Sequence, residues 1–155
     1  MQFFGRPFSG NPGMQTNNKY DKEVDVLVVG SGAGALTAAI VARAEGCKDV
    51  LVVEKSDQYG GTSAMSGGGI WIPNSHYARK QGVKDSTAEA LTYLKHVIGD
   101  EVSEERLRAY VEKAPEMLEY MAKNSRLQYE TVPYSDYYPE KPGGKEGHRT
   151  HQPTP

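Results

Sequence analysis

Two glycine-rich segments near the start of this sequence have the residue types of backbone ligand-binding sites. The first, GSGAGA (residues 30–35), lies between an apolar run and an alanine-rich run. Gly30 allows a sharp turn, Gly32 lets the main chain approach a pyrophosphate, and Ala35 takes the position where a helix packs closely on a strand. Backbone N–H groups at the helix start would face the phosphate charge. The pattern predicts a dinucleotide site.

An acidic residue follows at a distance that suits the same ligand. Glu54 ends the next apolar run, 24 residues after Gly30, close to the spacing of about 20 expected for an acid that binds ribose hydroxyls. An acid at this position, in place of an arginine, argues against the 2′-phosphate of NADP. It does not separate NAD from FAD.

The second glycine-rich segment is YGGTSAMSGGGIW, residues 59–71. An NAD-binding fold would continue from its second strand into another helix and strand, but this segment is too rich in glycine to be either. With so few large side chains, the main chain of this segment could lie against a flat, extended ligand and donate backbone N–H bonds to it. The hydroxyls of Thr62, Ser63 and Ser66 could donate further hydrogen bonds. A glycine-rich surface loop without a ligand is the alternative.

Regular elements must hold these segments in place. Residues 24–30 form a valine-rich apolar run typical of a strand buried on both faces. An alanine-dense helix should follow and end at Gly46, and residues 50–53 form a second strand. This order of elements is a βαβ unit, so the predicted fold class is α/β and Rossmann-like.

Two amphipathic helices are predicted in the second half. Ser86 and Glu89 form a capping box before the first helix, which carries Leu91, Leu94 and Ile98 on one stripe. The second helix places these residues at helical spacing: Leu107, Tyr110, Val111, Ala114, Leu118 and Met121. Pro115 should kink this helix or begin a new one. The proline-rich residues 132–155 are predicted to be a loop.

Two strands are too few for a parallel sheet, which needs neighbours and cover on both faces. We therefore expect the chain to be the N-terminal piece of a larger protein. Residues 1–22 suggest a flexible leader, and residues 23–155 the N-terminal part of a nucleotide-binding domain.

Composition excludes several classes of function. The net charge of −2 argues against nucleic-acid binding, and no apolar run reaches the roughly 18 residues of a transmembrane segment. Cys47 is the single cysteine, so a reducing compartment, the cytoplasm, is expected. Cys47 itself is interpreted as a turn residue. His148 and His151 lack further ligands at zinc spacing, so no metal site is predicted.

Four motifs together carry a family resemblance: VVGSGAGALTAAI, VVEK, GGTSAMSGGGIWIP and YSDYYPE. They resemble the flavoproteins related to fumarate reductase, and within them most closely the FAD-dependent 3-ketosteroid dehydrogenases of the Δ1 type. The resemblance covers about residues 24–145. It implies a bipartite FAD-binding domain, whose sheet later segments complete, with a substrate domain inserted between them.

The resemblance also implies roles for individual residues. The FAD pyrophosphate would be held by Gly30, Ser31, Gly32, Gly34 and Ala35. Glu54 would bind the adenosine ribose, with Lys55 beside it. The second segment would run along the phosphates and the isoalloxazine through Gly61, Thr62, Ser63, Ser66, Gly67 and Gly68.

A tyrosine-rich segment is the remaining candidate for chemistry. Tyr134, Tyr137 and Tyr138 lie between two prolines, and from the residues alone they could equally be surface or packing aromatics. The resemblance makes Tyr137 the catalytic candidate, hydrogen-bonded to a second tyrosine that acts as the base and lies beyond this chain. Tyr138 is the neighbouring alternative. A free phenol has a pKa of about 10 and needs such help near neutral pH.

The leading hypothesis is therefore 1,2-desaturation of a 3-ketosteroid in steroid catabolism, by proton abstraction and hydride transfer to FAD, with an external electron acceptor. A fumarate reductase-like enzyme acting on another enoate is one alternative, and an inactive dinucleotide-binding fragment is another. Trp71 could line a substrate pocket, although packing beside the flavin is the preferred interpretation.

Overall fold

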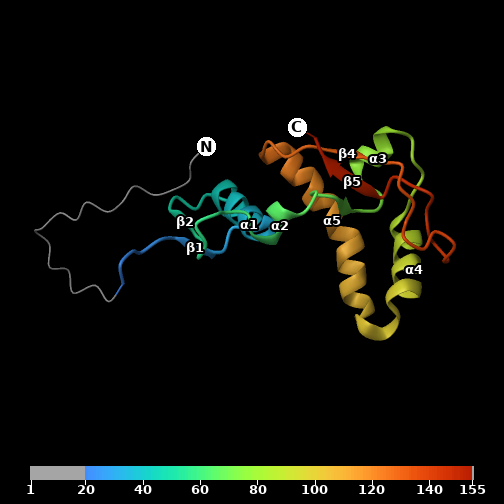
Figure 1. The fold of residues 1–155 in the computed structure, drawn as a ribbon, viewed down its shortest axis with the longest axis horizontal. Coiled ribbons are helices and arrows are strands. Elements are labelled where there is room, and N and C mark those ends of the chain that lie inside the picture. Colours follow the sequence, from blue (N-terminus) through green and yellow to red (C-terminus); the bar gives the residue numbers. More distant parts are fainter. Residues whose placement is uncertain (1–19, 155) are drawn as a thin grey trace, which may run out of the picture.

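The structure is a computed structural model, and it describes residues 20–154 (Figure 1). The leader predicted over residues 1–22 lies outside the described residues, except for residues 20–22. Within the described residues, no helix combines the length and the apolar character that crossing a membrane would require.

The predicted βαβ unit is confirmed. β1 (Val26–Val29) and β2 (Val50–Val53) pair in parallel, with Val26 opposite Val50, and α1 (Ala33–Ala44) connects them. The helix ends where the sequence predicts, because Gly46 adopts a φ of +101°, which ordinary side chains avoid. The carboxylate of Asp25 accepts the backbone N–H groups of Lys48 and Asp49, which ties the start of β1 to the start of β2.

The prediction that these strands are buried on both faces is wrong for this chain. Val28 is buried, but its neighbours Leu27 and Val29 are 55% and 78% exposed. Successive strand residues point to opposite faces, and α1 covers one of those faces. Among residues 20–154, nothing covers the other face to the same extent.

The second glycine-rich segment contains a short helix, α2 (Gly61–Met65), before β3 (Ile70–Trp71). The prediction that this segment is too rich in glycine to contain either a helix or a strand is therefore wrong. The glycines lie at its start, where Gly60 and Gly61 have φ values of +109° and +55°. They make the turn, and the Thr-Ser-Ala-Met run that follows has side chains compatible with a helical turn.

The helices of the second half agree with the sequence pattern. After α3 (His76–Lys80), α4 (Thr87–Ile98) begins at Ser86, whose hydroxyl accepts the N–H of Glu89. A 3-10 turn, η1 (Gly99–Glu101), leads to α5 (Glu104–Asn124).

A single helix passes through Pro115. Its buried stripe continues on both sides of the proline, so one packed surface holds both halves of α5 and outweighs the missing N–H bond.

A small antiparallel sheet closes the second half. Its strand order is β3-β5-β4, formed with β4 (Tyr129–Thr131) and β5 (Thr150–Pro153). The prediction of a loop over residues 132–155 is therefore wrong at its end. β5 has the sequence Thr-His-Gln-Pro, without apolar alternation, and it becomes a strand because β3 and β4 pair with its two edges.

The core lies in the second half of the chain. One buried cluster joins α4 to α5 through Ala90, Leu91, Leu107 and Val111, and a second joins Ile72 to Ala114 and Leu118. In Figure 1 the βαβ unit lies at one end, the α4–α5 pair with the small sheet at the other, and α2 between them. The second glycine-rich segment is therefore the connection between the two halves.

Candidate functional site

The first glycine turn leaves the positive end of α1 open. Gly30 has a φ of +100°, and its N–H donates to Val53 O at 2.7 Å, so the turn continues the pairing of the two strands. Gly32 is the N-cap of α1, makes no side-chain capping bond, and is followed by a first turn without an acidic residue. The amide dipoles of this helix end therefore lack an anionic partner from the chain itself at this cap.

Ser31 and Glu54 form a hydrogen-bonded pair beside this turn. The buried Ser31 hydroxyl donates to Glu54 Oε2 at 2.5 Å and accepts the N–H of Gly60 at 2.8 Å. The second carboxylate oxygen of Glu54 accepts the N–H of Ser56 at 3.1 Å. The hydrogen bond from Ser31, followed by that from Ser56, lowers the pKa of Glu54. Glu54 is thus an oriented carboxylate at neutral pH.

The two glycine-rich segments meet at their helix starts. The N–H of Ala33 donates to the hydroxyl of Ser63 at 3.1 Å, which joins α1 to α2. A Cβ placed on Gly61 would lie 3.5 Å from the Cα of Gly32, so the two backbones pass close to each other. The structure therefore brings the two predicted segments and Glu54 together on one surface.

The second glycine-rich segment remains largely exposed beyond this contact. Ser66 accepts the N–H of Gly68 through its hydroxyl at 2.9 Å. Gly68 has a φ of +75°, and a Cβ there would lie 2.9 Å from Pro153 Cγ, so the segment rests on β5. The predicted residues Lys55, Thr62 and Gly67 are exposed.

Tyr137 combines an exposed side chain with a backbone that is anchored by its neighbours. Its side chain is 97% exposed, whereas the preceding residue, Asp136, is buried and fully engaged in hydrogen bonds. The backbone N–H of Tyr138 donates to the hydroxyl of Tyr93 on α4 at 3.3 Å. The structure therefore presents the Tyr137 phenol from an anchored backbone, without burying it against the predicted cofactor residues.

The sequence pattern did not predict the buried polar cluster around Arg149. Its guanidinium binds Asp85 through two hydrogen bonds of 3.0 and 2.7 Å and Asp136 through one of 2.9 Å. Asp136 lies within the motif YSDYYPE, but its partners are too distant in sequence for the motif to reveal them.

The indole of Trp71 belongs to the same cluster. The ring lies 5.9 Å from that of Tyr93 and stacks on Tyr110 at 6.3 Å, and the Nε1–H donates to Asp136 at 2.7 Å. Trp71 therefore packs against aromatic side chains of α4 and α5. Its position beside a flavin stays a prediction.

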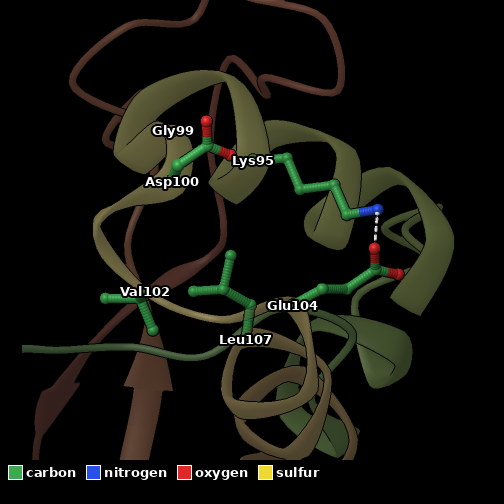
Figure 2. Close-up of a pocket in the computed structure, with 6 residues that line it drawn as sticks. All are labelled: Lys95, Gly99, Asp100, Val102, Glu104 and Leu107. Carbon is green, nitrogen blue, oxygen red and sulfur yellow. Dashed lines mark ion pairs between the residues drawn. The ribbon is translucent and has the colours of Figure 1, made fainter.

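A hollow at the turn between α4 and α5 lies apart from all of these residues. Figure 2 shows its lining, from Lys95 on α4 to Leu107 on α5, and the ion pair of 2.5 Å between Lys95 Nζ and Glu104. Lys95 and Glu104 neutralise each other there, and Asp100 is the remaining charged residue of the lining. Across residues 20–154, no group of three or more His, Cys, Asp or Glu side chains could hold a metal ion.

FAD fits the surface formed by the two glycine-rich segments. The start of α1 has a neutral partner in the Ser63 hydroxyl but no acidic residue in its first turn, and it suits a pyrophosphate because helix N-termini attract anions. The oriented carboxylate of Glu54 can accept hydrogen bonds from ribose hydroxyls, and the exposed segment after Gly60 gives a flat ring access to main-chain amides. When bound, FAD would supply a hydride acceptor.

Comparison with known proteins agrees with this geometry. The family model of the FAD binding domain matches residues 25–155. A 3-oxosteroid 1-dehydrogenase of Mycobacterium tuberculosis is 49% identical over 86% of this chain and 24% of its own length. The chain thus spans about a quarter of the length of the curated relatives it matches.

Solved structures show the same fold. The structure of 3-ketosteroid Δ1-dehydrogenase from Sterolibacterium denitrificans has a TM-score of 0.78 and 55% identity, covering 84% of this chain and 23% of that one. A flavocytochrome c3 fumarate reductase has a TM-score of 0.67 at 22% identity, covers 84% of this chain and 22% of its own, and supports the fold alone. With its βαβ start, its open helix end and the match over residues 25–155, the chain belongs to the FAD binding domain family.

Proposed function

We propose that this chain is the N-terminal FAD-binding part of a 3-ketosteroid Δ1-dehydrogenase, which removes one hydrogen from C1 and one from C2 of a 3-oxosteroid. The observation that carries the proposal is the 55% identity to the Sterolibacterium denitrificans enzyme over 84% of this chain. The match to the FAD binding domain, over residues 25–155, includes both glycine-rich segments. An external electron acceptor would then restore the oxidised cofactor.

The chain contributes binding and orientation to this reaction. The first turn, from Gly30 to Ala35, holds the pyrophosphate at the start of α1. Glu54, oriented by the Ser31 hydroxyl, binds the adenosine ribose. The remaining cofactor contacts come from Lys55, Gly61, Thr62, Ser63, Ser66, Gly67 and Gly68.

Tyr137 would stabilise the base of the reaction. Proton removal beside the 3-keto group requires a basic group, and a phenolate serves only if hydrogen bonds stabilise it. The exposed phenol of Tyr137 is available to donate such a bond to a tyrosine from another part of the protein. Tyr137 thus acts through the base, without itself removing the proton.

The direct test is a desaturation assay with the purified full-length protein. We expect the protein to carry FAD and to convert a 3-oxo-4-ene steroid to the 3-oxo-1,4-diene in the presence of an artificial electron-accepting dye. Mass spectrometry would detect the loss of two hydrogens, and bleaching of the dye would report the electrons transferred. The variant Tyr137→Phe should keep FAD and lose about two orders of magnitude in kcat, in line with the usual contribution of one acid–base group.

Each outcome has a distinct meaning. A yellow protein that leaves 3-oxosteroids unchanged but reduces an enoate such as fumarate would contradict the steroid assignment. An unchanged rate in Tyr137→Phe would remove Tyr137 from the mechanism and leave the assignment of the reaction intact. Tyr134→Phe, on the same loop, is the matched control and should behave like the wild type.

A further inference from the structure

The buried cation Arg149 holds three segments of the chain at one point. Its side chain is 1% exposed and lies between the carboxylates of Asp85 and Asp136. A further N–H donates to the carbonyl of Gly143 at 2.8 Å. The guanidinium also lies 5.5 Å from the ring centre of Trp71 and 5.8 Å from that of Tyr93, as expected for cation–π contacts.

Both carboxylates of the cluster are saturated with donors. Asp85 additionally accepts the backbone N–H groups of Asn74 and Ser86, and Asp136 accepts the Trp71 Nε1–H and the N–H of Lys145. A buried polar network with all its members satisfied is rigid and specifies one arrangement. The segments that meet here are therefore fixed relative to each other.

One of these segments is the loop that carries Tyr137. The N–H of Asp136 donates to Lys145 O at 2.9 Å, and the N–H of Lys145 donates back to the Asp136 carboxylate at 2.9 Å. These bonds close the loop of residues 137–144 at its base. Gly143 lies directly against the backbone of α4 at Glu89, where a Cβ would overlap the carbonyl oxygen. The loop is thus anchored at both ends, and Tyr137 projects from its first position.

The cluster also includes the end of the glycine-rich surface. Trp71 closes residues 59–71, and its Nε1–H reaches the carboxylate of the residue that precedes Tyr137. A buried ion pair often contributes little net stability compared with apolar packing, and its best-attested role is to fix register. The cluster has the geometry for that role, because it joins the predicted cofactor surface to the predicted catalytic loop through a single carboxylate.

We propose that Trp71, Asp136 and Arg149 are positioning residues that set the place of the Tyr137 phenol relative to the glycine-rich surface. This inference rests on the proposed function for Tyr137. None of the three needs to touch the substrate, because each acts through the backbone of Asp136 and Tyr137.

The test is a double-mutant cycle in the full-length holoenzyme with Trp71→Phe and Tyr137→Phe. Phenylalanine keeps an aromatic ring beside Arg149 and removes the Nε1–H donor. We expect Trp71→Phe to retain FAD and to lower kcat about tenfold with little change in KM, within the usual range of coupling between residues of one network. In the Tyr137→Phe background the same substitution should change kcat less than about twofold. Tyr134→Phe is the matched control, because it removes a tyrosine hydroxyl three residues before Tyr137 and outside the network.

A second readout requires no turnover. Amide hydrogen exchange over residues 133–147, followed by mass spectrometry, should be faster in Trp71→Phe than in the wild type and unchanged in Tyr134→Phe. Asp136→Asn should also show faster amide exchange over residues 133–147. This variant can be used in place of Trp71→Phe if Trp71→Phe cannot be obtained as folded protein.

The outcomes separate this inference from the proposed function. Equal effects of Trp71→Phe in both backgrounds, or unchanged exchange over residues 133–147, would overturn the positioning role. A wild-type protein that leaves steroids unchanged contradicts the proposed function, and the exchange data then decide by themselves whether the cluster anchors the loop. If Tyr137→Phe retains full activity, the positioning role is overturned as well, because the Tyr137 hydroxyl then does not contribute to the reaction.

Discussion

At the scale of single residues, the Ser31 hydroxyl links the first glycine turn to two other parts of the predicted cofactor surface. It donates to Glu54 and accepts from the N–H of Gly60. A hydroxyl has one proton, and this one is given to Glu54. Any hydrogen bond from Ser31 to a phosphate would therefore have to come from its backbone N–H, while its side chain orients the carboxylate for the ribose.

Ser31→Ala should weaken FAD binding. We expect the dissociation constant of FAD, measured by titrating the deflavinated full-length protein, to rise about tenfold, because one hydrogen bond to a charged group is lost. Ser135→Ala is the control, since the Ser135 hydroxyl donates to the carbonyl and the carboxylate of Glu146 and lies outside the predicted cofactor surface. An unchanged constant in Ser31→Ala would show that Glu54 does not depend on this bond.

At the scale of elements, α4 is the support for the tyrosine-bearing loop. Gly143 has a φ of +80° and lies so close to α4 that a Cβ would overlap Glu89 O and come within 2.8 Å of Tyr93 N. Both partners are backbone atoms of a helix that is packed into the core, so neither can move aside at small cost. The glycine is therefore required twice, by its conformation and by the close approach.

Gly143→Ala should destabilise the full-length protein more than Gly82→Ala. Gly82 has a similar φ of +77°, but a Cβ added there would meet nothing within 4 Å. Its substitution should incur only the left-handed strain of about 1–2 kcal/mol. Thermal unfolding should therefore show the lower Tm for Gly143→Ala. Equal losses of stability in the two variants would contradict the close approach of Gly143 to the backbone of α4.

At the scale of the whole molecule, the β1–β2 pair is the part of the fold with the least cover. Leu27 and Val29 lie exposed beside buried Val28, and α1 of this unit contacts α5 of the packed helix pair. Exposed valine and leucine on a parallel sheet are unusual, because such sheets are normally covered on both faces. We expect this face to be covered in a protein of the length of the matched relatives.

The 155-residue chain expressed alone should therefore behave differently from the full-length protein. It should bind a hydrophobic dye such as ANS more strongly per molecule, because the sheet face is open. It should also show no measurable steroid desaturation, since the proposed base lies beyond this chain. Substantial turnover by the isolated chain would place the base within these residues and contradict the proposed mechanism.

Local patterns were sufficient for the first half of the site. The βαβ unit, the turn at Gly30 and the acid at Glu54 are close in sequence, and their chemistry depends on glycine conformation, strand length and spacing. Capping at Ser86 and the apolar stripe of α4 are local for the same reason. The family resemblance added FAD, which the comparison with the FAD binding domain family supports.

Tertiary contacts decided the rest. β5 is a strand because β3 and β4 offer it two edges, and α5 continues through Pro115 because one core surface holds both halves. The Arg149 cluster joins Asp85, Asp136 and Trp71 across long stretches of chain. A single polar residue carries no periodic signal, so its partner is known only when the fold brings the two together. The sequence thus identified the backbone segments that are proposed to receive the cofactor, and the packed structure decided how the loop that carries Tyr137 is anchored.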